Sequence, residues 1–296
     1  MALAAGPALR QVFGETVAEL AREDPRILLL DGDLGSSTGG YIFEAAHPAR
    51  YIQSGIAEQN MLAMAAGLAT VGYQPYISTF SCFAVARALD SIRVLIAQPA
   101  LDVKIMGGYA GLLTGMTGKT HQMLDDVAIM RTLPNMTVLA PGDQTEAKQA
   151  IRAIAGIAGP AYMQITREPS DVLFGADYRF RLGRAVTVHE GSDVTLISTG
   201  VQSTRTYQAA EILAGRGIGA AVVLALVAAV WLGDAVLGKR ASPAAAPSLK
   251  SAGLFRPAME PSMPFDFQQL ANFRLARGSH KQPNKGSPDD LFKTAR

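Results

Sequence analysis

Runs of strand length alternate with stretches of helical pattern over the first 170 residues, and this alternation constrains the fold more than any other feature. Between the runs lie helical patterns that proline or glycine closes, such as the alanine-rich stretch at 57–71 before Gly72. Mostly apolar strands separated by helices are typical of a parallel sheet that is buried on both faces. The sequence therefore predicts an α/β fold with a doubly wound parallel sheet, whose strands lie at 27–30, 51–54, 74–79, 103–106, 136–140 and 161–166.

A second and smaller α/β unit follows a linker at 171–184. Strand patterns at 193–199 and 218–223 flank a helical pattern at 203–216. One βαβ unit of this size is too small to close its own core. We therefore predict that this second domain is incomplete.

The distribution of charge divides the chain a second time, at about residue 239. The net charge of +2 combines −4 over residues 1–238 with +6 over residues 239–296, and the second region is also rich in proline. A basic, proline-rich segment of this kind is typical of a chain without a packed core. The expected domains are an α/β domain at 1–175, a partial C-terminal α/β domain at 185–238 and a disordered basic tail at 239–296.

Composition excludes several classes of protein. A single cysteine, Cys82, excludes a disulfide scaffold, and a net charge of +2 gives no case for nucleic-acid binding. The first residues lack a charged stretch followed by an apolar one, so we expect a cytoplasmic protein. Residues 217–233 are 17 uncharged positions, which is the lower limit for a membrane span. A truncated third domain explains them better, and a membrane anchor remains the less favoured hypothesis.

Four patterns at predicted strand ends are candidate site residues, and each also has a plain structural interpretation. Glu58 begins a helix, where a carboxylate complements the helix dipole, and two aromatic residues, Phe80 and Phe83, have the spacing of core residues. His121 follows a glycine-rich loop, although a lone histidine is more often structural. Arg167 at a strand end is compatible with a surface ion pair. No cluster with metal-ligand spacing is evident.

Taken together, these stretches resemble the pyrimidine-binding domain of thiamine-diphosphate-dependent transketolases. The resemblance covers about residues 8–175, and about 185–223 resemble the start of the family's third domain. Chains of similar length form the second subunit of split transketolases. No single stretch is decisive, but six occur in the family's order, at residues 33–38, 55–61, 78–83, 118–122, 133–136 and 166–167.

The resemblance implies a role for each candidate residue. Glu58 would hydrogen-bond N1′ of the cofactor's aminopyrimidine and favour the tautomer that generates the carbon nucleophile, while the cofactor itself supplies the electron sink. The remaining implied roles are packing on the pyrimidine by Phe80 and Phe83, a position near the thiazolium for Asp33, and substrate contacts from Ser37, His121 and Arg167, with His121 also as a proton carrier.

Two departures from the family pattern lie at the end of the site that binds the donor sugar. Tyr109 replaces a histidine that helps to hold the sugar phosphate, and Thr117 replaces an aspartate. The family's Gly-Asp-Gly…Asn motif for diphosphate and magnesium is not found here, and Asp31-Gly32-Asp33 does not fit it. The resemblance therefore implies a partner, an N-terminal subunit that supplies the ligands of Mg²⁺ and diphosphate, in an α2β2 heterotetramer.

The expected function is that of the C-terminal subunit of a transketolase, which transfers a two-carbon ketol unit between sugars, with sugar phosphates as the expected substrates. Two alternatives remain open at this point. One is a condensation like that of deoxyxylulose-phosphate synthase, which begins with a decarboxylation. The other is a catalytically silent scaffold or regulatory partner.

Overall fold

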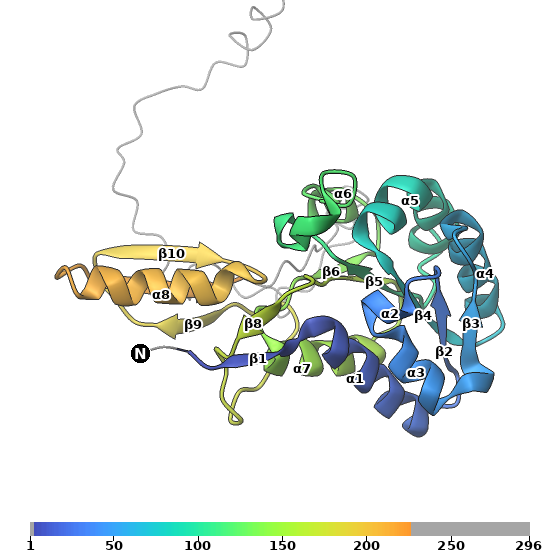
Figure 1. The fold of residues 1–296 in the computed structure, drawn as a ribbon, viewed down its shortest axis with the longest axis horizontal. Helices are drawn as coiled ribbons and strands as arrows, with labels where there is room; N and C mark the ends of the chain where they lie inside the picture. Colours follow the sequence, from blue (N-terminus) through green and yellow to red (C-terminus); the bar gives the residue numbers. More distant parts are fainter. Residues whose placement is uncertain (1–2, 226–296) are drawn as a thin grey trace, which may run out of the picture. The chain divides into compact units, whose positions relative to one another are not determined.

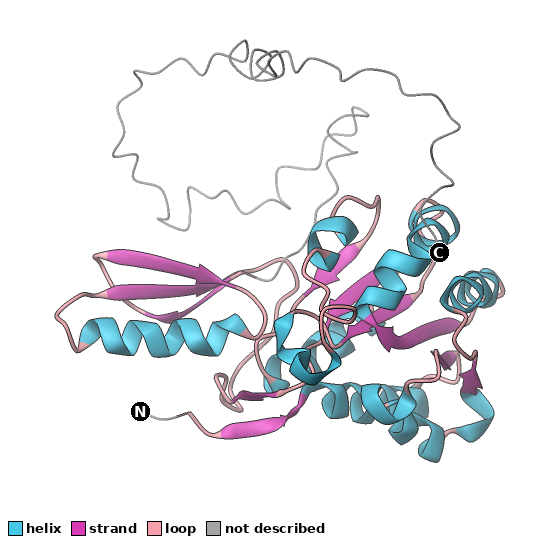
Figure 2. Cartoon of the chain, turned by 45° about the horizontal axis from the view of Figure 1, so that its top comes forward, coloured by secondary structure: helices cyan, strands magenta, loops and turns pink. Residues whose placement is uncertain are grey.

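A computed structural model describes residues 3–225, and it contains a six-stranded parallel sheet (Figures 1 and 2). The central strand β4 is fully buried along its length, and β2 beside it is also buried throughout. This burial explains why their sequences lack polar alternation. In spatial order the strands are β3 (Tyr51–Gln53), β2 (Ile27–Asp31), β4 (Gln74–Phe80), β5 (Lys104–Gly108), β7 (Ala161–Gln164) and β6 (Thr137–Leu139).

Helices cover both faces of this sheet and form two separate apolar cores. One core lies under α1 (Leu9–Glu23), α3 (Gly40–Ala46) and α7 (Gln144–Ala155). The other lies under α4 (Glu58–Thr70), α5 (Ala88–Ser91) and α6 (Asp126–Met130), on the opposite face in Figure 1. The predicted doubly wound parallel sheet is confirmed.

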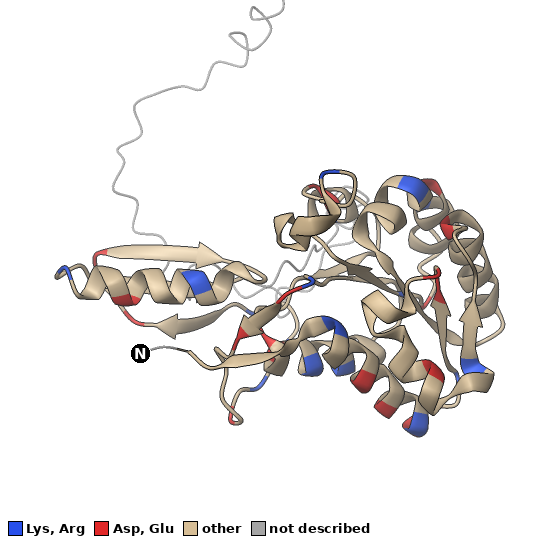
Figure 3. Cartoon of the chain, in the orientation of Figure 1, with Lys and Arg blue, Asp and Glu red and all other residues tan. Residues whose placement is uncertain are grey.

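Ion pairs on the outer surface join α1 to α7. The Arg152 guanidinium lies 2.9 Å from a Glu19 carboxylate oxygen and 3.1 Å from one of Glu23. Lys148 lies 3.0 Å from the other Glu19 oxygen, and both signs of charge lie along α1 in Figure 3. These side chains are partly exposed, so we attribute most of the packing free energy to the apolar core beneath them.

The helical segment that follows β4 is interrupted. It consists of two π-helical segments, Phe83–Arg87 and Ile92–Ala97, on either side of α5. Two shorter helical elements were not expected at these bounds: α2 (Gly35–Thr38) and the 3-10 turn Leu112–Thr117, inside the predicted glycine-rich loop. π-helical turns widen a helix locally and often occur beside functional sites. A further 3-10 turn covers Pro48–Arg50.

One glycine shows how tightly the sheet is packed beneath the strand ends. A Cβ atom at Gly107, in β5, would lie 2.1 Å from the hydroxyl oxygen of Tyr162 in β7. That hydroxyl donates a hydrogen bond of 2.6 Å to the buried Asp126 carboxylate, which begins α6. The Gly107 position therefore requires a residue without a side chain, because the tyrosine is fixed by its bond to Asp126.

The residues after the sheet form a smaller unit of three strands and one helix. Strand β11 (Ala220–Leu224) pairs with β10 (Val194–Ser198) in parallel and with β9 (Val186–His189) antiparallel. The helix α8 (Gln202–Ala214) packs on this sheet, and the sequence analysis missed β9. The remaining strands, β1 (Ala5–Ala8) and β8 (Pro169–Asp171), form an antiparallel pair.

The predicted basic tail at 239–296 and the last part of the predicted second domain lie outside the described residues, as does part of the segment at 217–233. Within residues 3–225, no helix is both long enough and apolar enough to cross a bilayer. That finding does not extend to the rest of the chain.

Candidate active site

The carboxyl ends of the parallel strands bring distant segments together at one edge of the sheet. Strand β2 ends in the loop that carries Asp33 and Ser37, and β4 ends at Phe80. Strand β5 ends immediately before Tyr109, and β7 ends shortly before Arg167. The candidate residues from the sequence therefore lie at, or shortly after, the carboxyl ends of the strands, at the same edge of one sheet.

Glu58 is the most unusual residue at this edge. It is the first residue of α4, yet its side chain is only 1% exposed. Its Oε2 atom accepts a hydrogen bond of 2.7 Å from Nη1 of Arg87, whereas Oε1 is buried without a hydrogen-bond partner among residues 3–225. A buried acceptor without a partner costs about 1–3 kcal/mol. A carboxylate whose only role was to complement the helix dipole would be stabilised equally well while facing solvent. The burial of Glu58 therefore favours a role in binding a ligand.

Four aromatic rings gather at the same edge of the sheet. The Phe80 ring stacks on Tyr109 with a centroid distance of 4.1 Å and on Phe83 with a centroid distance of 5.7 Å. The His121 ring meets both phenylalanines edge-on, at 5.9 Å from Phe80 and 5.3 Å from Phe83. The guanidinium of Arg87 lies 4.5 Å from the Phe83 ring centroid and so connects this aromatic cluster to Glu58. Flat apolar faces of this kind suit a flat heterocycle.

Two arginines lie beside Tyr109 at the other end of the site. Nη1 of Arg10 donates to that hydroxyl at 3.2 Å and to the Ser37 carbonyl oxygen at 2.9 Å. The Arg167 guanidinium lies 5.8 Å from the Tyr109 ring centroid, and hydrogen bonds to Tyr109 and Glu168 raise the pKa of Arg167. We call these four residues, Arg10, Ser37, Tyr109 and Arg167, the arginine cluster. Two guanidinium groups at one point favour an anionic ligand.

Tyr109 also has an unusual backbone. Its φ angle of +57° lies in the left-handed region, which a bulky residue adopts at a cost. The ring is 5% exposed and is held between Phe80 and the two arginines. The surrounding contacts thus keep this residue in a strained conformation that joins the aromatic cluster to the arginine cluster.

The loop after β2 places the remaining candidates. Asp33 is exposed, has a φ angle of +65°, and donates its backbone N–H to Oε1 of Gln53 at 3.0 Å. The same Gln53 oxygen accepts from the N–H of Gly55 at 2.9 Å, so one side chain ties the Asp33 loop to the segment before Glu58. Ser37 contributes its backbone carbonyl to the arginine cluster.

Asp31 differs from Asp33 in being completely buried. Burial raises the pKa of the Asp31 carboxyl above its ordinary value, and hydrogen bonds from Leu34, Ser78, Gly35 and Tyr51 oppose that rise. Its Oδ1 atom accepts the Leu34 N–H at 2.7 Å, immediately before α2. The Asp31 carboxylate therefore holds the backbone immediately before α2.

Two residues of the site escaped the sequence analysis: Arg87 and Arg10. Arg87 follows Phe83 by four residues, and this spacing places two side chains on one face of a helix. That spacing could have identified Arg87 as a residue of the site. Arg10 lies in α1, and no local pattern connects it to the loops with which it interacts. His121 was expected near Phe83, and the structure places it there. Its Nδ1 atom lies 2.8 Å from the Thr120 hydroxyl.

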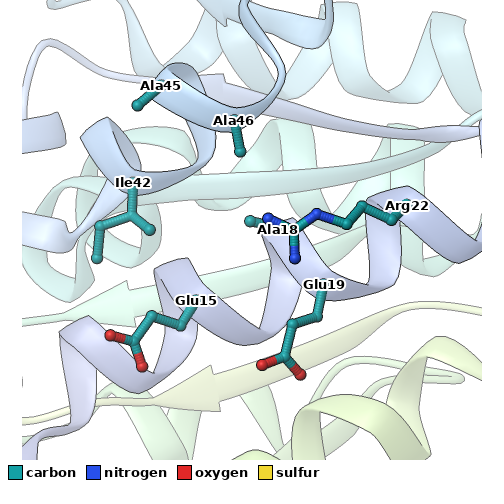
Figure 4. A pocket seen from close by; sticks show the side chains of 7 residues that line it. All are labelled: Glu15, Ala18, Glu19, Arg22, Ile42, Ala45 and Ala46. Atoms are coloured by element: carbon teal, nitrogen blue, oxygen red, sulfur yellow. The ribbon is translucent and has the colours of Figure 1, made fainter.

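A shallow groove of about 420 Å³ lies between α1 and α3 (Figure 4). The residues that line it include Glu15, Glu19 and Ile42, and none of the candidate site residues is among them. The groove is therefore separate from the aromatic cluster and from the arginine cluster.

Comparison with known proteins identifies the family of this chain. The transketolase pyrimidine-binding domain matches residues 5–170, and the transketolase C-terminal domain matches residues 183–232. A putative transketolase C-terminal section from Methanocaldococcus jannaschii is 41% identical over 73% of this chain and 69% of its own length. The chain therefore belongs to the transketolase family.

Two further proteins extend this result. The 6-deoxy-6-sulfo-D-fructose transketolase subunit SqwH of a Clostridium species is 38% identical over 73% of this chain and 67% of its own length. A solved structure of a split-gene transketolase, described as an inactive β4 tetramer, superposes with a TM-score of 0.68. That structure is 41% identical and covers 74% of this chain and 71% of its own. The homologues are transferases, and they include subunits of split transketolases.

Proposed function

We propose that this chain is the C-terminal subunit of a thiamine-diphosphate-dependent transketolase, active together with an N-terminal subunit. The observation that carries the proposal is the buried Glu58, whose Oε1 atom has no partner among the described residues and whose Oε2 atom is joined through Arg87 to the aromatic cluster. The pyrimidine-binding domain that matches residues 5–170 supports the same conclusion.

The residues at this end of the site fit the aminopyrimidine of the cofactor. When bound, thiamine diphosphate supplies a carbon nucleophile and an electron sink. Oε1 of Glu58 would hold a proton at N1′ of the pyrimidine, since a partner there would satisfy the buried oxygen. Phe80 and Phe83 would pack against the ring and exclude water from it. His121, at the edge of both rings, would donate a hydrogen bond or a proton to substrate oxygens. Asp33, on the exposed loop after β2, would lie towards the thiazolium.

The diphosphate and Mg²⁺ would be held by the N-terminal subunit. Support comes from the two relatives that are themselves parts of transketolases, the C-terminal section and the split-gene subunit. The split-gene structure contains β subunits alone and is described as inactive, which favours a requirement for a second kind of subunit. We propose an α2β2 heterotetramer with the cofactor between the two kinds of chain.

The arginine cluster would bind the charged end of a sugar substrate. Arg10 donates a hydrogen bond to the Tyr109 hydroxyl, and the Arg167 guanidinium lies 5.8 Å from the Tyr109 ring centroid. A tetrahedral oxyanion such as a phosphate or a sulfonate suits two guanidinium groups and a phenol that lie close together. The relative named for 6-deoxy-6-sulfo-D-fructose supports a sugar with an anionic end as the substrate class.

The direct test is reconstitution. The chain is combined with an N-terminal transketolase subunit, thiamine diphosphate, Mg²⁺, a ketose phosphate or sulfonate and an aldose acceptor, and the products are analysed by mass spectrometry. We expect an acceptor lengthened by two carbons and a donor shortened by two, only when all components are present. Decarboxylation of an α-keto acid in place of this transfer would favour the synthase-like alternative, and no turnover with any donor would favour the silent scaffold.

A further inference from the structure

Arg87 holds the first turn of α4 in two ways. Its Nη1 atom donates to Oε2 of Glu58 at 2.7 Å, and its carbonyl oxygen accepts from Nε2 of Gln59 at 3.1 Å. Arg87 ends the π-helical turn that begins at Phe83, and its guanidinium lies 4.5 Å from the Phe83 ring centroid. One residue therefore fixes both the carboxylate and the aromatic ring that would bind the pyrimidine.

We infer that Arg87 is a positioning residue for the cofactor, because it occupies one oxygen of Glu58 and leaves the other as the only acceptor for the aminopyrimidine. This inference rests on the proposed function. A carboxylate has two equivalent oxygens and can rotate, so an unrestrained Glu58 would present N1′ with a mixture of orientations. With Oε2 bound to Arg87, the buried Oε1 has one direction, and no donor in the described part of the chain competes for it.

The burial of Glu58 separates this pair from an ordinary surface ion pair. The Arg87 side chain is 45% exposed, but the Glu58 side chain is 1% exposed. A buried carboxylate needs a charge partner, and removal of that partner leaves the charge uncompensated. The same helical segment offers a contrast in Arg93, which bonds to Asp90 at 2.6 Å with both side chains largely exposed. A pair of that kind contributes little.

The experiment measures cofactor affinity instead of turnover. Thiamine diphosphate with Mg²⁺ is titrated by calorimetry into the complex of this chain with the N-terminal subunit. We expect R87M to weaken binding about tenfold or more, as for loss of a hydrogen bond to a charged group. R87K keeps a cation and should recover part of that affinity. R93M, the matched control on the same segment, should bind like the unmodified chain.

Chemical rescue separates positioning from a general effect on folding. Methylguanidinium at millimolar concentration should restore cofactor affinity to R87A, because it can occupy the space between Glu58 and Phe83. It should not restore affinity to E58Q, where the carboxylate itself is changed. Far-UV circular dichroism and thermal unfolding of each variant verify the fold, and R87K provides the comparison if R87M and R87A are unstable.

The outcomes distinguish the inference from the proposed function on which it rests. If E58Q weakens cofactor binding but neither R87M nor R87K does, the positioning role of Arg87 is wrong and the proposed function stands. If methylguanidinium fails to rescue a folded R87A, the positioning role is also contradicted. If the unmodified complex does not bind the cofactor, or E58Q binds it equally well, the proposed function itself is contradicted.

Discussion

The two ends of the candidate site differ in burial and in charge. At one end a carboxylate that is 1% exposed is joined through Arg87 to an aromatic ring, and one of its oxygens has no partner among residues 3–225. At the other end the partly exposed Arg10 and Arg167 lie beside Tyr109. Buried polar groups in an aromatic setting fix one orientation of a ligand, whereas partly exposed cations attract a class of anions. The first end thus suits an invariant cofactor and the second a substrate that varies among relatives.

The largest effect is expected at the buried end. E58Q keeps the shape of the side chain but cannot exchange a proton with the pyrimidine, so kcat should fall about 10²-fold or more. The reconstituted complex is assayed at saturating cofactor, so that weaker binding does not account for the loss. An E58Q complex with more than half of the normal kcat would contradict the role of this carboxylate.

Substitution of Arg167 at the cationic end should change KM for the ketose substrate instead of kcat. R167M removes a fork of donors from an anionic substrate, and KM for a phosphorylated or sulfonated ketose should rise about 10- to 100-fold. KM for L-erythrulose, an uncharged ketose, should change little. Steady-state kinetics with both donors make the measurement, and an equal rise for both donors would show that Arg167 acts on folding or on the cofactor.

Tyr109 should show a smaller effect of the same kind. Y109F removes one neutral hydrogen-bonding group and keeps the ring that stacks on Phe80. We expect about a three- to tenfold rise in KM for the anionic donor, with cofactor affinity unchanged. Y109H, which introduces the family's usual residue, tests whether a histidine can replace the phenol. Weaker cofactor binding by Y109F would mean that the two ends do not act separately.

The smallest effect is expected on the stability of the fold, through the buried carboxyl of Asp31. Because burial raises the pKa of Asp31 in the folded chain above its value of 3.8 in a model compound, folding favours the protonated form. The carboxyl therefore destabilises the fold increasingly as pH rises from about 4 through the folded pKa. D31N should raise Tm by a few degrees at neutral pH, and the difference should vanish near pH 4. The Tm of D31N is compared with that of the unmodified chain at each pH. If this difference in Tm is lower at neutral pH than at pH 4, the raised pKa assigned to Asp31 is contradicted.

The strands of the sheet could be predicted from the sequence because the pattern that identifies each strand lies within a few neighbouring residues. The buried runs at β2 and β4 have no polar alternation, and helix stops such as Gly72 lie between them. The strand β9 was missed because Val186–His189 is short and pairs only with β11, which lies more than thirty residues later in the chain. The π-helical segments were also missed, since helical spacing in a sequence does not distinguish α from π geometry.

The site was predicted in part. Residues next to strand ends, such as Phe83 and His121, follow from the position of the strands, and the structure brings these two together. Arg10 could not be placed in this way, because its partner Tyr109 is 99 residues away and the contact depends on how α1 packs. The sequence also could not show that Arg87 bonds to Oε2 of Glu58 and leaves Oε1 unbonded among the described residues. That difference depends on the π-helical turn that ends at Arg87.

The most direct measurement of the central claim is a crystal structure of this chain with an N-terminal transketolase subunit, thiamine diphosphate and Mg²⁺. We predict that Oε1 of Glu58 lies about 2.6–3.2 Å from N1′ of the pyrimidine while Oε2 remains bound to Arg87. A pyrimidine ring bound elsewhere, or an Oε1 atom that still lacks a partner when the cofactor is present, would contradict the account.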